Sequence, residues 1–468
     1  MTLINKRLPS LASAAAILVL ASSALGAQRA ELEKVIQRKV LPNGLEVIVA
    51  ENHGVPIVTV EITVRNGSFT QSPEYAGLAH MYEHMFFKSN DKYPNPDQFI
   101  DRASELGAVF NASTREEQVN YYLTVPSDSL EGGMRFLAAA LLGAKFRQDE
   151  LERERQVVIG EYDRNESSPF FRLEEAMGRK LWATEWSRKN VIGDRRVIST
   201  VTPEKMRAIQ ELYYVPNNSV LIISGDVNPA RSFAMAGQIF SLWRYGDDPW
   251  AKAPVPAIPP LAKNDGVIVE EPVQSVTVLV QWQGPSVRKD EVATFVADVY
   301  SDVLNNPQSR FQRRLVDSGL WQGALVNYYT LNNVGPITMS GQTTPEKLRE
   351  ALKVMFVELK ASAQPGYFSQ EELEATKANR IVTSAFGRER SSEFSHTIGF
   401  WWSVSGLEYY MKYVDEMAKR TRADLRAYAT KYIIDRPHVV GVMIPADLRK
   451  RINLSEAELA QMAPGVMR

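Results

Sequence analysis

The sequence contains no cysteine among its 468 residues. Disulfides are therefore excluded, no cysteine is present to carry a lipid anchor, and stability must come from core burial. Strong charge of either sign is absent too, because 54 lysines and arginines nearly balance 55 aspartates and glutamates. This balance gives no electrostatic reason to expect a nucleic acid or an anionic membrane as partner. An apolar content of 44% is ample for the core of a large globular protein.

Histidine is also scarce, yet two of the five histidines flank a glutamate in His80-Met81-Tyr82-Glu83-His84. A stripe of apolar residues at helical spacing predicts one helix here. Its members are Leu78, Met81, Tyr82, Met85 and Phe86. Residues four apart on a helix lie one above the other, so both imidazoles can reach one Zn²⁺ while Glu83 stays beside its water. The alternative is an amphipathic helix with two solvated histidines.

A hydrolytic zinc site needs a third protein ligand, and the segment from 149 to 166 offers two candidates. This segment is rich in helix formers, and Glu154 and Glu161 fall two turns apart on one face of the predicted helix. Solvated carboxylates paired with neighbouring arginines are the alternative.

The order H-x-x-E-H inverts the zincin motif and resembles that of the inverzincins, the pitrilysin or M16 zinc metallopeptidases. The similarity extends along Gly77–Lys88 and to the spacing, since 76 residues separate His84 from Glu161. The chain resembles the M16B branch of this family, with similarity to the metal-bearing subunit of the mitochondrial processing peptidase. The resemblance implies one Zn²⁺ per chain, held by His80, His84 and Glu161, and a supporting catalytic role for Glu154.

Glu83 is the expected general base of such a site. It takes a proton from the attacking water and returns it to the leaving amine, a role typically worth about 10²–10⁴-fold in rate. The sequence therefore predicts a zinc metalloendopeptidase.

The first 27 residues are typical of a secretory signal peptide. Lys6 and Arg7 precede an uncharged stretch that ends in small residues, with cleavage expected near positions 24–27. An uncleaved anchor and a mitochondrial transit peptide are the alternatives, but the apolar centre is short and arginine is scarce. Export without a membrane anchor predicts a periplasmic protein in a bacterium with two membranes.

Three similarities recur in the same order along the chain. Val47-Ile48-Val49 returns at 267–269, Val58-Thr59-Val60 at 276–278, and Phe146 with its following acidic segment at Phe368, with offsets of 220, 218 and 222. Ordered matches at nearly one offset indicate two duplicated halves. Alternating strand-like and helical segments favour an α+β fold, and the resemblance specifies two α/β-sandwich halves of the pitrilysin/LuxS-like metallohydrolase type.

We therefore expect a zinc-binding domain at 28–246, a stiff, extended proline-rich linker at 247–265, and an inactive domain at 266–468. The second domain lacks metal ligands, because the offset maps the zinc motif onto Tyr300–Leu304 and the two glutamates onto Thr376 and Thr383.

The substrate is expected to bind as an added strand. The segment around Asn111 and Ala112 resembles the family's edge strand, beside which an extended peptide pairs through its main chain. An ordinary surface strand is the alternative. Phe87 is similar to the family position that lines the pocket for the residue after the cut. The alternative is that Phe87 belongs to the core.

One departure from the family concerns an arginine and a tyrosine that the inactive half supplies in many members. Gly319-Leu320 fixes the register, and the two positions hold Leu315 and Gln322. Arg313, Arg314, Tyr328 and Tyr329 lie close by in sequence. We therefore expect a homologous partner subunit that carries the missing pair, in a heterodimer, with a homodimer as the alternative. A site-specific processing peptidase and a non-catalytic M16-like subunit are the alternative functions.

Overall fold

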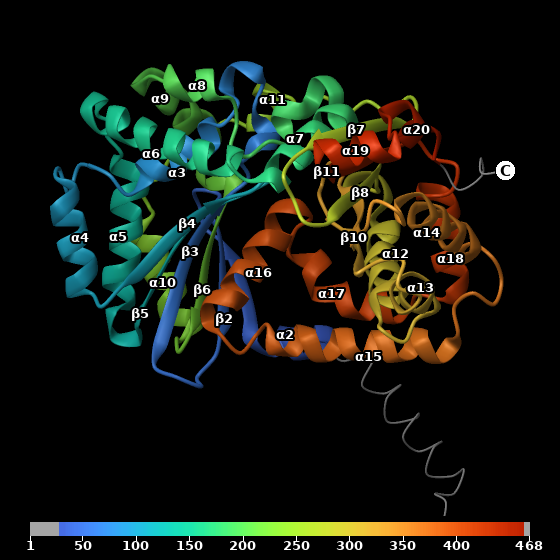
Figure 1. Ribbon diagram of the computed structural model, residues 1–468. Helices are drawn as coiled ribbons and strands as arrows, with labels where there is room; N and C mark the ends of the chain where they lie inside the picture. The colour runs from blue at the N-terminus through green and yellow to red at the C-terminus, as the bar shows by residue number, and fades with distance from the viewer. Residues whose placement is uncertain (1–27, 463–468) are drawn as a thin grey trace, which may run out of the picture.

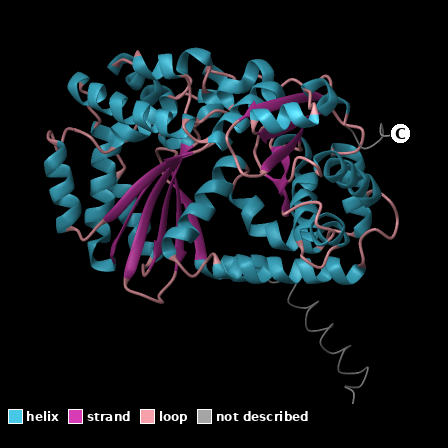
Figure 2. Cartoon of the chain, viewed as in Figure 1, coloured by secondary structure: helices cyan, strands magenta, loops and turns pink. Residues whose placement is uncertain are grey.

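The computed structural model describes residues 28–462. The predicted signal peptide lies outside the described residues. Two separate β-sheets, each flanked by helices, make up the molecule (Figure 2). The fold is thus the predicted pair of α/β halves.

The first sheet has six strands in the order β1-β2-β6-β3-β5-β4. These strands are β1 (Ile36–Val40), β2 (Glu46–Glu51), β3 (Ile57–Val64), β4 (Val109–Thr114), β5 (Val119–Pro126) and β6 (Ser219–Gly225). Only β2 and β6 run parallel to each other, and β4 forms one edge. The associated helices are α2 (Gln28–Val35), α3 (Leu78–Phe86), α4 (Pro96–Glu105), α5 (Leu130–Gly143), α6 (Gln148–Glu166), α7 (Pro169–Trp182), α8 (Arg195–Ser199), α9 (Pro203–Tyr213) and α10 (Pro229–Ile239).

The second sheet repeats this topology with five strands in the order β7-β11-β8-β10-β9. These strands are β7 (Asp265–Glu270), β8 (Val276–Gln283), β9 (Gly323–Tyr328), β10 (Pro336–Thr343) and β11 (His438–Ile444). The parallel pair β7 and β11 corresponds to β2 and β6. The helices that follow β8 are α12 (Val287–Asn305), α13 (Arg310–Gln312), α14 (Leu348–Ser362), α15 (Gln370–Phe386), α16 (Ser391–Val404), α17 (Leu407–Ala418), α18 (Arg422–Tyr432), α19 (Ala446–Ile452) and α20 (Glu456–Gln461). Two of the recurring segments therefore occupy equivalent strands, and the acidic run of the third begins the helices α6 and α15.

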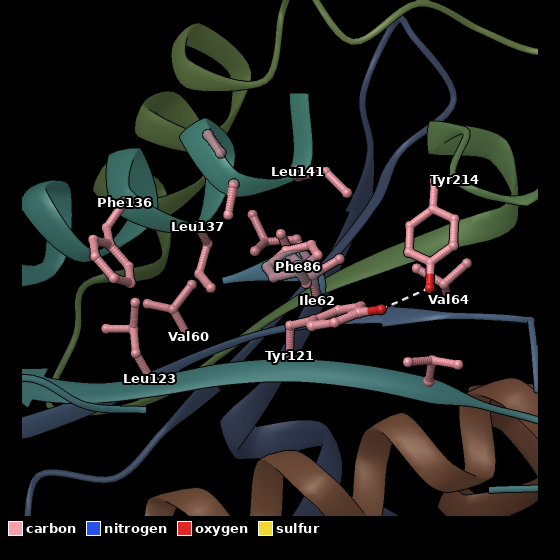
Figure 3. Packing of buried hydrophobic residues seen from close by; sticks show 14 of the residues in the cluster. Val60, Ile62, Val64, Phe86, Tyr121, Leu123, Phe136, Leu137, Leu141 and Tyr214 are labelled. Carbon is pink, nitrogen blue, oxygen red and sulfur yellow. Dashed lines mark hydrogen bonds between the residues drawn. The ribbon is translucent and has the colours of Figure 1, made fainter. Parts of the chain in front are cut away.

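One face of the first sheet packs against α3 and α5 to form the larger core. Phe86 of α3 stacks on Tyr121 of β5 with ring centroids 3.6 Å apart, and the Tyr121 hydroxyl is bonded to that of Tyr214 at 2.7 Å (Figure 3). Burying a large aromatic or aliphatic side chain contributes about 1.5–3 kcal/mol, so these rings hold α3 firmly on the sheet.

The two halves exchange helices across their interface. The helix α16 of the second half covers the other face of the first sheet, where Ile398 and Trp402 join Ile48 and Ile222 in one buried cluster (Figure 1). Reciprocally, α7 of the first half packs on the second sheet, where Met177 joins a cluster with residues of β8 and β11. Each half therefore completes the other half's sandwich.

The connector between the halves is not uniformly extended as expected. A short helix, α11 (Pro249–Lys252), interrupts it, because Asp248 accepts the backbone N–H of Trp250 and Pro249 suits the first helical turn. Trp250 then stacks on Phe69 at 5.4 Å. The assignment of 28–246, 247–265 and 266–468 as domains and linker stays a prediction.

Candidate metal centre and peptide cleft

His80 and His84 lie on helix α3, whose first residue is fixed by the conformation of Gly77. The helix begins after Gly77, whose φ of 93° favours glycine, and an added Cβ there would come within 2.8 Å of the Ile192 carbonyl oxygen. The Gly77 N–H donates to Oε1 of Gln71 at 2.7 Å. The imidazoles lie on the side of α3 away from the buried Tyr82 and Phe86.

Helix α6 places Glu161 opposite the two imidazoles. Its Oε2 lies 3.6 Å from Nε2 of His80 and 3.6 Å from Nε2 of His84. The three ligand atoms lie within 4.8 Å of one another, and this is the one group of its kind among residues 28–462. Leu151 and Val158, on the same side of α6, are fully buried and fix the face that it presents.

The donor set fits a divalent metal ion. Two imidazole nitrogens and one carboxylate oxygen are the protein ligands of many catalytic zinc sites, and a ligand imidazole must be neutral. Burial, and next the charge of His84, lowers the pKa of His80 to about 4, which keeps that ring neutral. Imidazole and carboxylate also accept Mn²⁺ or Co²⁺.

Glu154 orients one of the imidazoles. Its Oε2 lies 3.2 Å from Nδ1 of His84, and its Oε1 lies 2.7 Å from Nζ of Lys88. A proton on Nδ1 leaves Nε2, the nitrogen that faces Glu161, free as a ligand. Burial alone would lower the pKa of His84, but the Glu154 hydrogen bond and the attraction of Glu161 and Glu83 raise it above its ordinary value.

Glu83 lies in the same cavity as His80 and Glu161. Its Oε2 accepts a hydrogen bond from Oγ1 of Thr114 at 2.6 Å. Burial raises the pKa of Glu83 above its ordinary value, which makes the carboxylate a better proton acceptor. No sequence spacing could have identified Thr114, because it lies 31 residues from Glu83 on a different element. Lys88, by contrast, is four residues after His84, a spacing that can be read from the sequence.

The cavity has a volume of about 700 Å³ and lies between the halves. Strand β4 contributes Ala112, Ser113 and Thr114, and the second half contributes Tyr329 and Thr338 among others. The predicted edge strand thus borders the predicted metal centre. Asn111 is exposed, and its Oδ1 accepts the backbone N–H of Ala112 at 2.9 Å.

Phe87 follows α3 and does not line this cavity. Its ring is partly buried among aromatic residues, with centroids 4.8 Å from Phe110 and 5.8 Å from Phe99. A role for Phe87 in substrate binding stays a prediction.

The positions of the missing arginine and tyrosine lie away from the cavity lining. Leu315 is fully buried in a turn of π-helix, and Gln322 is exposed immediately before β9. Arg313 and Arg314 are exposed, and the Tyr328 hydroxyl donates to the Pro285 carbonyl at 3.0 Å. Of the nearby candidates, Tyr329 alone lines the cavity, a contribution from the second half that the sequence did not single out.

In the second half, α12 and α15 correspond to α3 and α6, and the positions that match the metal ligands hold other residues. Tyr300 and Leu304 lie on α12, and Thr376 and Thr383 on α15. An ion pair between Asp302 and Arg380, 2.6 Å long, joins these two helices instead.

Residues 46–194 match the family described as Insulinase (Peptidase family M16), and residues 200–380 match the Peptidase M16 inactive domain. The chain is 25% identical over 404 residues to the zinc protease PqqE of Helicobacter pylori, covering 84% of this chain and 89% of that protein. It is 25% identical to a probable mitochondrial-processing peptidase subunit beta of Arabidopsis thaliana, covering 55% of this chain and 48% of that one.

A solved structure shows the same fold. The periplasmic protease PqqL of Escherichia coli superposes with a TM-score of 0.74 at 18% sequence identity, covering 91% of this chain and 49% of that chain. This chain therefore spans about half the length of PqqL.

Proposed function

The chain belongs to peptidase family M16, and on that premise we propose that it is a zinc-dependent endopeptidase that cleaves peptides or short unfolded segments. The observation that carries the proposal is the convergence of His80, His84 and Glu161, with Glu83 in the same cavity. An M16-like subunit with only a structural role has no need of this set of side chains.

His80, His84 and Glu161 would hold one Zn²⁺ per chain. When bound, the ion lowers the pKa of a water molecule toward about 7 and polarises a peptide carbonyl. Glu154 keeps Nε2 of His84 directed at Glu161 through its contact with Nδ1.

Glu83 acts as the general base. Its carboxylate takes a proton from the attacking water and later gives it to the leaving amine. The hydrogen bond from Thr114 restricts the carboxylate to one orientation and leaves Oε1 for the water. Because Thr114 ends β4, the base and the substrate strand are placed by the same element.

The substrate binds as a strand added to the edge of β4. Ala112 offers main-chain pairing, and Asn111 lies beside it. Phe87 lies outside the lining of the metal-centre cavity, and its proposed place in the pocket for the residue after the cut rests on the family resemblance. Backbone pairing tolerates many sequences, which suits the degradation of unrelated peptides.

The Glu83→Gln variant tests this function. We expect it to retain zinc and to lose peptide hydrolysis by about 10²-fold or more, because glutamine cannot accept the proton. Elemental analysis and hydrolysis of a quenched-fluorescent peptide, with chelation and zinc add-back, give both readouts. Glu105→Gln, an exposed change at the end of α4, is the matched control. A fully active Glu83→Gln protein would refute the assignment.

A partner subunit is part of the proposal. Leu315 and Gln322 stand where an arginine and a tyrosine are expected, and this chain spans about half of PqqL. We propose a heterodimer with a homologous subunit that supplies this pair, with a homodimer as the alternative. The activity of the purified chain, measured with its molar mass by light scattering, decides the matter. Full activity as a monomer excludes the partner.

The second candidate is a site-specific processing peptidase, which the similarity to a mitochondrial-processing peptidase subunit beta supports. Digestion of a peptide library separates the two candidates, since a processing enzyme yields one cut site and a degradative enzyme yields many.

The residues before Gln28 support export to the periplasm with cleavage near positions 24–27. PqqL, a structural relative, is named as periplasmic. Within 28–462, none of the helices has the length and apolarity to span a bilayer. Sequencing the amino terminus of the protein recovered from a periplasmic extract tests this assignment.

A further inference from the structure

A second cavity, of about 420 Å³, lies where the two halves and the connector meet. The first half contributes Arg65 and Phe69, the connector contributes Trp250, and the second half contributes Arg288 and Gly406. The metal centre and its cleft use none of these residues. The volume falls in the range of roughly 300–1,000 Å³ that is usual for small-molecule sites.

Arg65 is a largely buried cation that has no ion pair within the described part of the chain. Its Nη2 donates to the Trp402 carbonyl at 3.1 Å, and its guanidinium carbon lies 3.8 Å from the centre of the Trp402 ring. Among residues 28–462 the bond to the Trp402 carbonyl is the one hydrogen bond of the Arg65 side chain, and Arg65 borders the cavity. Burial lowers the pKa of Arg65, and the attraction of Glu46 opposes this shift.

The carboxylates nearby are already engaged. Glu117 borders the cavity, but its oxygens accept the backbone N–H groups of Asn332 at 2.6 Å and Asn333 at 2.8 Å. Glu46 attracts Arg65 from a distance, and its Oε2 accepts Nε1–H of Trp402 at 2.8 Å. Neither acid therefore neutralises Arg65 by direct contact.

Two further features favour an anion. Arg288 is exposed at the cavity, and no side chain of residues 28–462 pairs with its guanidinium. Gly406 precedes α17, a helix of 12 residues that begins without a side-chain cap, so partial positive charge lies at that rim. With Arg65, these groups surround the cavity with donors.

Two aromatic rings form part of the remaining wall. Phe69 and Trp250 stack with their centroids 5.4 Å apart, and both border the cavity. A ligand that meets both arginines and this wall needs an oxyanion at one end and an apolar body at the other.

We propose that this cavity binds a small organic oxyanion, an apolar ring or chain that bears one carboxylate or phosphate group. The oxyanion pairs with Arg65 and Arg288, and the apolar body lies against Phe69 and Trp250. Such a ligand contacts both halves and the connector, so its binding also stabilises the folded chain.

Isothermal titration of the purified chain with 3-phenylpropionate and with phenyl phosphate tests the proposal. Both are expected to bind saturably at one site, and the tighter of the two identifies the oxyanion class. The neutral 3-phenylpropionamide, which has the same apolar body, is expected to bind about ten-fold more weakly or not at all. Equal binding of the acid and the amide, or no saturable binding of either anion, overturns the proposal.

Variants locate the bound anion. Arg288→Gln changes an exposed side chain and is expected to weaken binding about ten-fold without loss of fold. Arg65→Gln is expected to abolish binding, and circular dichroism checks its folding. Arg313→Gln, another exposed arginine, is the matched control and should bind as the unchanged chain does. If Arg288→Gln binds both anions as tightly as the unchanged chain, they bind elsewhere and the proposal is wrong.

Discussion

At the scale of single residues, the metal centre depends on side chains that hold other side chains. Lys88 lies 2.7 Å from Glu154, and Glu154 lies 3.2 Å from His84. The hydroxyl of Thr114 similarly holds Glu83. The proximity of His80, His84 and Glu161 was predictable from H-x-x-E-H and its spacing to Glu161, and their roles as ligands stay a prediction. The hydroxyl of Thr114 was not, since it reaches Glu83 only after β4 folds beside α3.

Replacing Glu154 by Gln is expected to weaken zinc binding by about 10–100-fold, the usual cost of removing a carboxylate that orients a ligand histidine. Turnover at saturating zinc should fall less than in Glu83→Gln. Titration with a competing chromophoric chelator measures the affinity. Glu152→Gln, an exposed position on the same helix, should leave it unchanged. Unaltered affinity in Glu154→Gln would show that His84 needs no such support.

At the scale of elements, β4 is the open edge of the first sheet beside the metal centre. The backbone N–H of Arg115 donates to the backbone carbonyl of Gln118, just beyond the pairing of β4 with β5. The N–H of Arg115 therefore faces the β5 side. Because alternate residues of a strand face opposite edges, the N–H of Ala112 faces away from β5, where it meets only Oδ1 of Asn111. That N–H is therefore available to a substrate strand.

Proline is tolerated on an edge strand where its N–H would face outward, so Ala112→Pro removes one donor without breaking the pairing with β5. We expect kcat/KM for peptides to fall about ten-fold, mainly through KM, with zinc content unchanged. Steady-state kinetics test this, and Ala112→Ser, which keeps the N–H, is the control. Equal kinetics for the two variants would place the substrate elsewhere.

The same scale shows what the sequence could and could not predict. The apolar stripe of α3 and the helix-forming residues of α6 predicted both helices, because local periodicity and propensity are readable in a sequence. The connector was predicted less well. Five prolines indicated an extended chain, but Asp248 and Pro249 start a short helix whose Trp250 packs on Phe69, a contact far away in sequence.

At the scale of the whole molecule, the halves are joined through a buried polar network. Glu61 of β3 is fully buried and accepts hydrogen bonds from Asn120 at 2.8 Å and from Ser395 at 2.8 Å, and it lies 2.6 Å from Nδ1 of His396. Ser395 and His396 belong to α16 of the second half. The offsets predicted the duplication, but not the exchange of α7 and α16, because each helix packs on a sheet whose strands are distant from it in sequence.

We expect His396 to make this interface sensitive to pH. Burial alone would lower its pKa, but Glu61, assisted by Glu393 on its own helix, raises it above the ordinary 6.5, while Arg115 opposes the shift. The ring also meets Tyr122 at 4.2 Å. Because the pKa is higher in the folded protein, the stabilisation is complete below about pH 6.5 and is lost as pH rises through the raised value.

Urea unfolding of the unchanged chain and of His396→Gln between about pH 6 and pH 8 measures this contribution. The unchanged chain should lose more of its free energy of unfolding across that range than the variant does. Parallel curves would mean that His396 carries no such charge in the folded protein.

Anomalous X-ray diffraction at the zinc absorption edge, from crystals grown with zinc, tests the central claim most directly. The account predicts one strong peak per chain, about 2.0–2.2 Å from Nε2 of His80, Nε2 of His84 and an oxygen of Glu161. A peak at another position, or Glu161 turned away from both imidazoles, would contradict it.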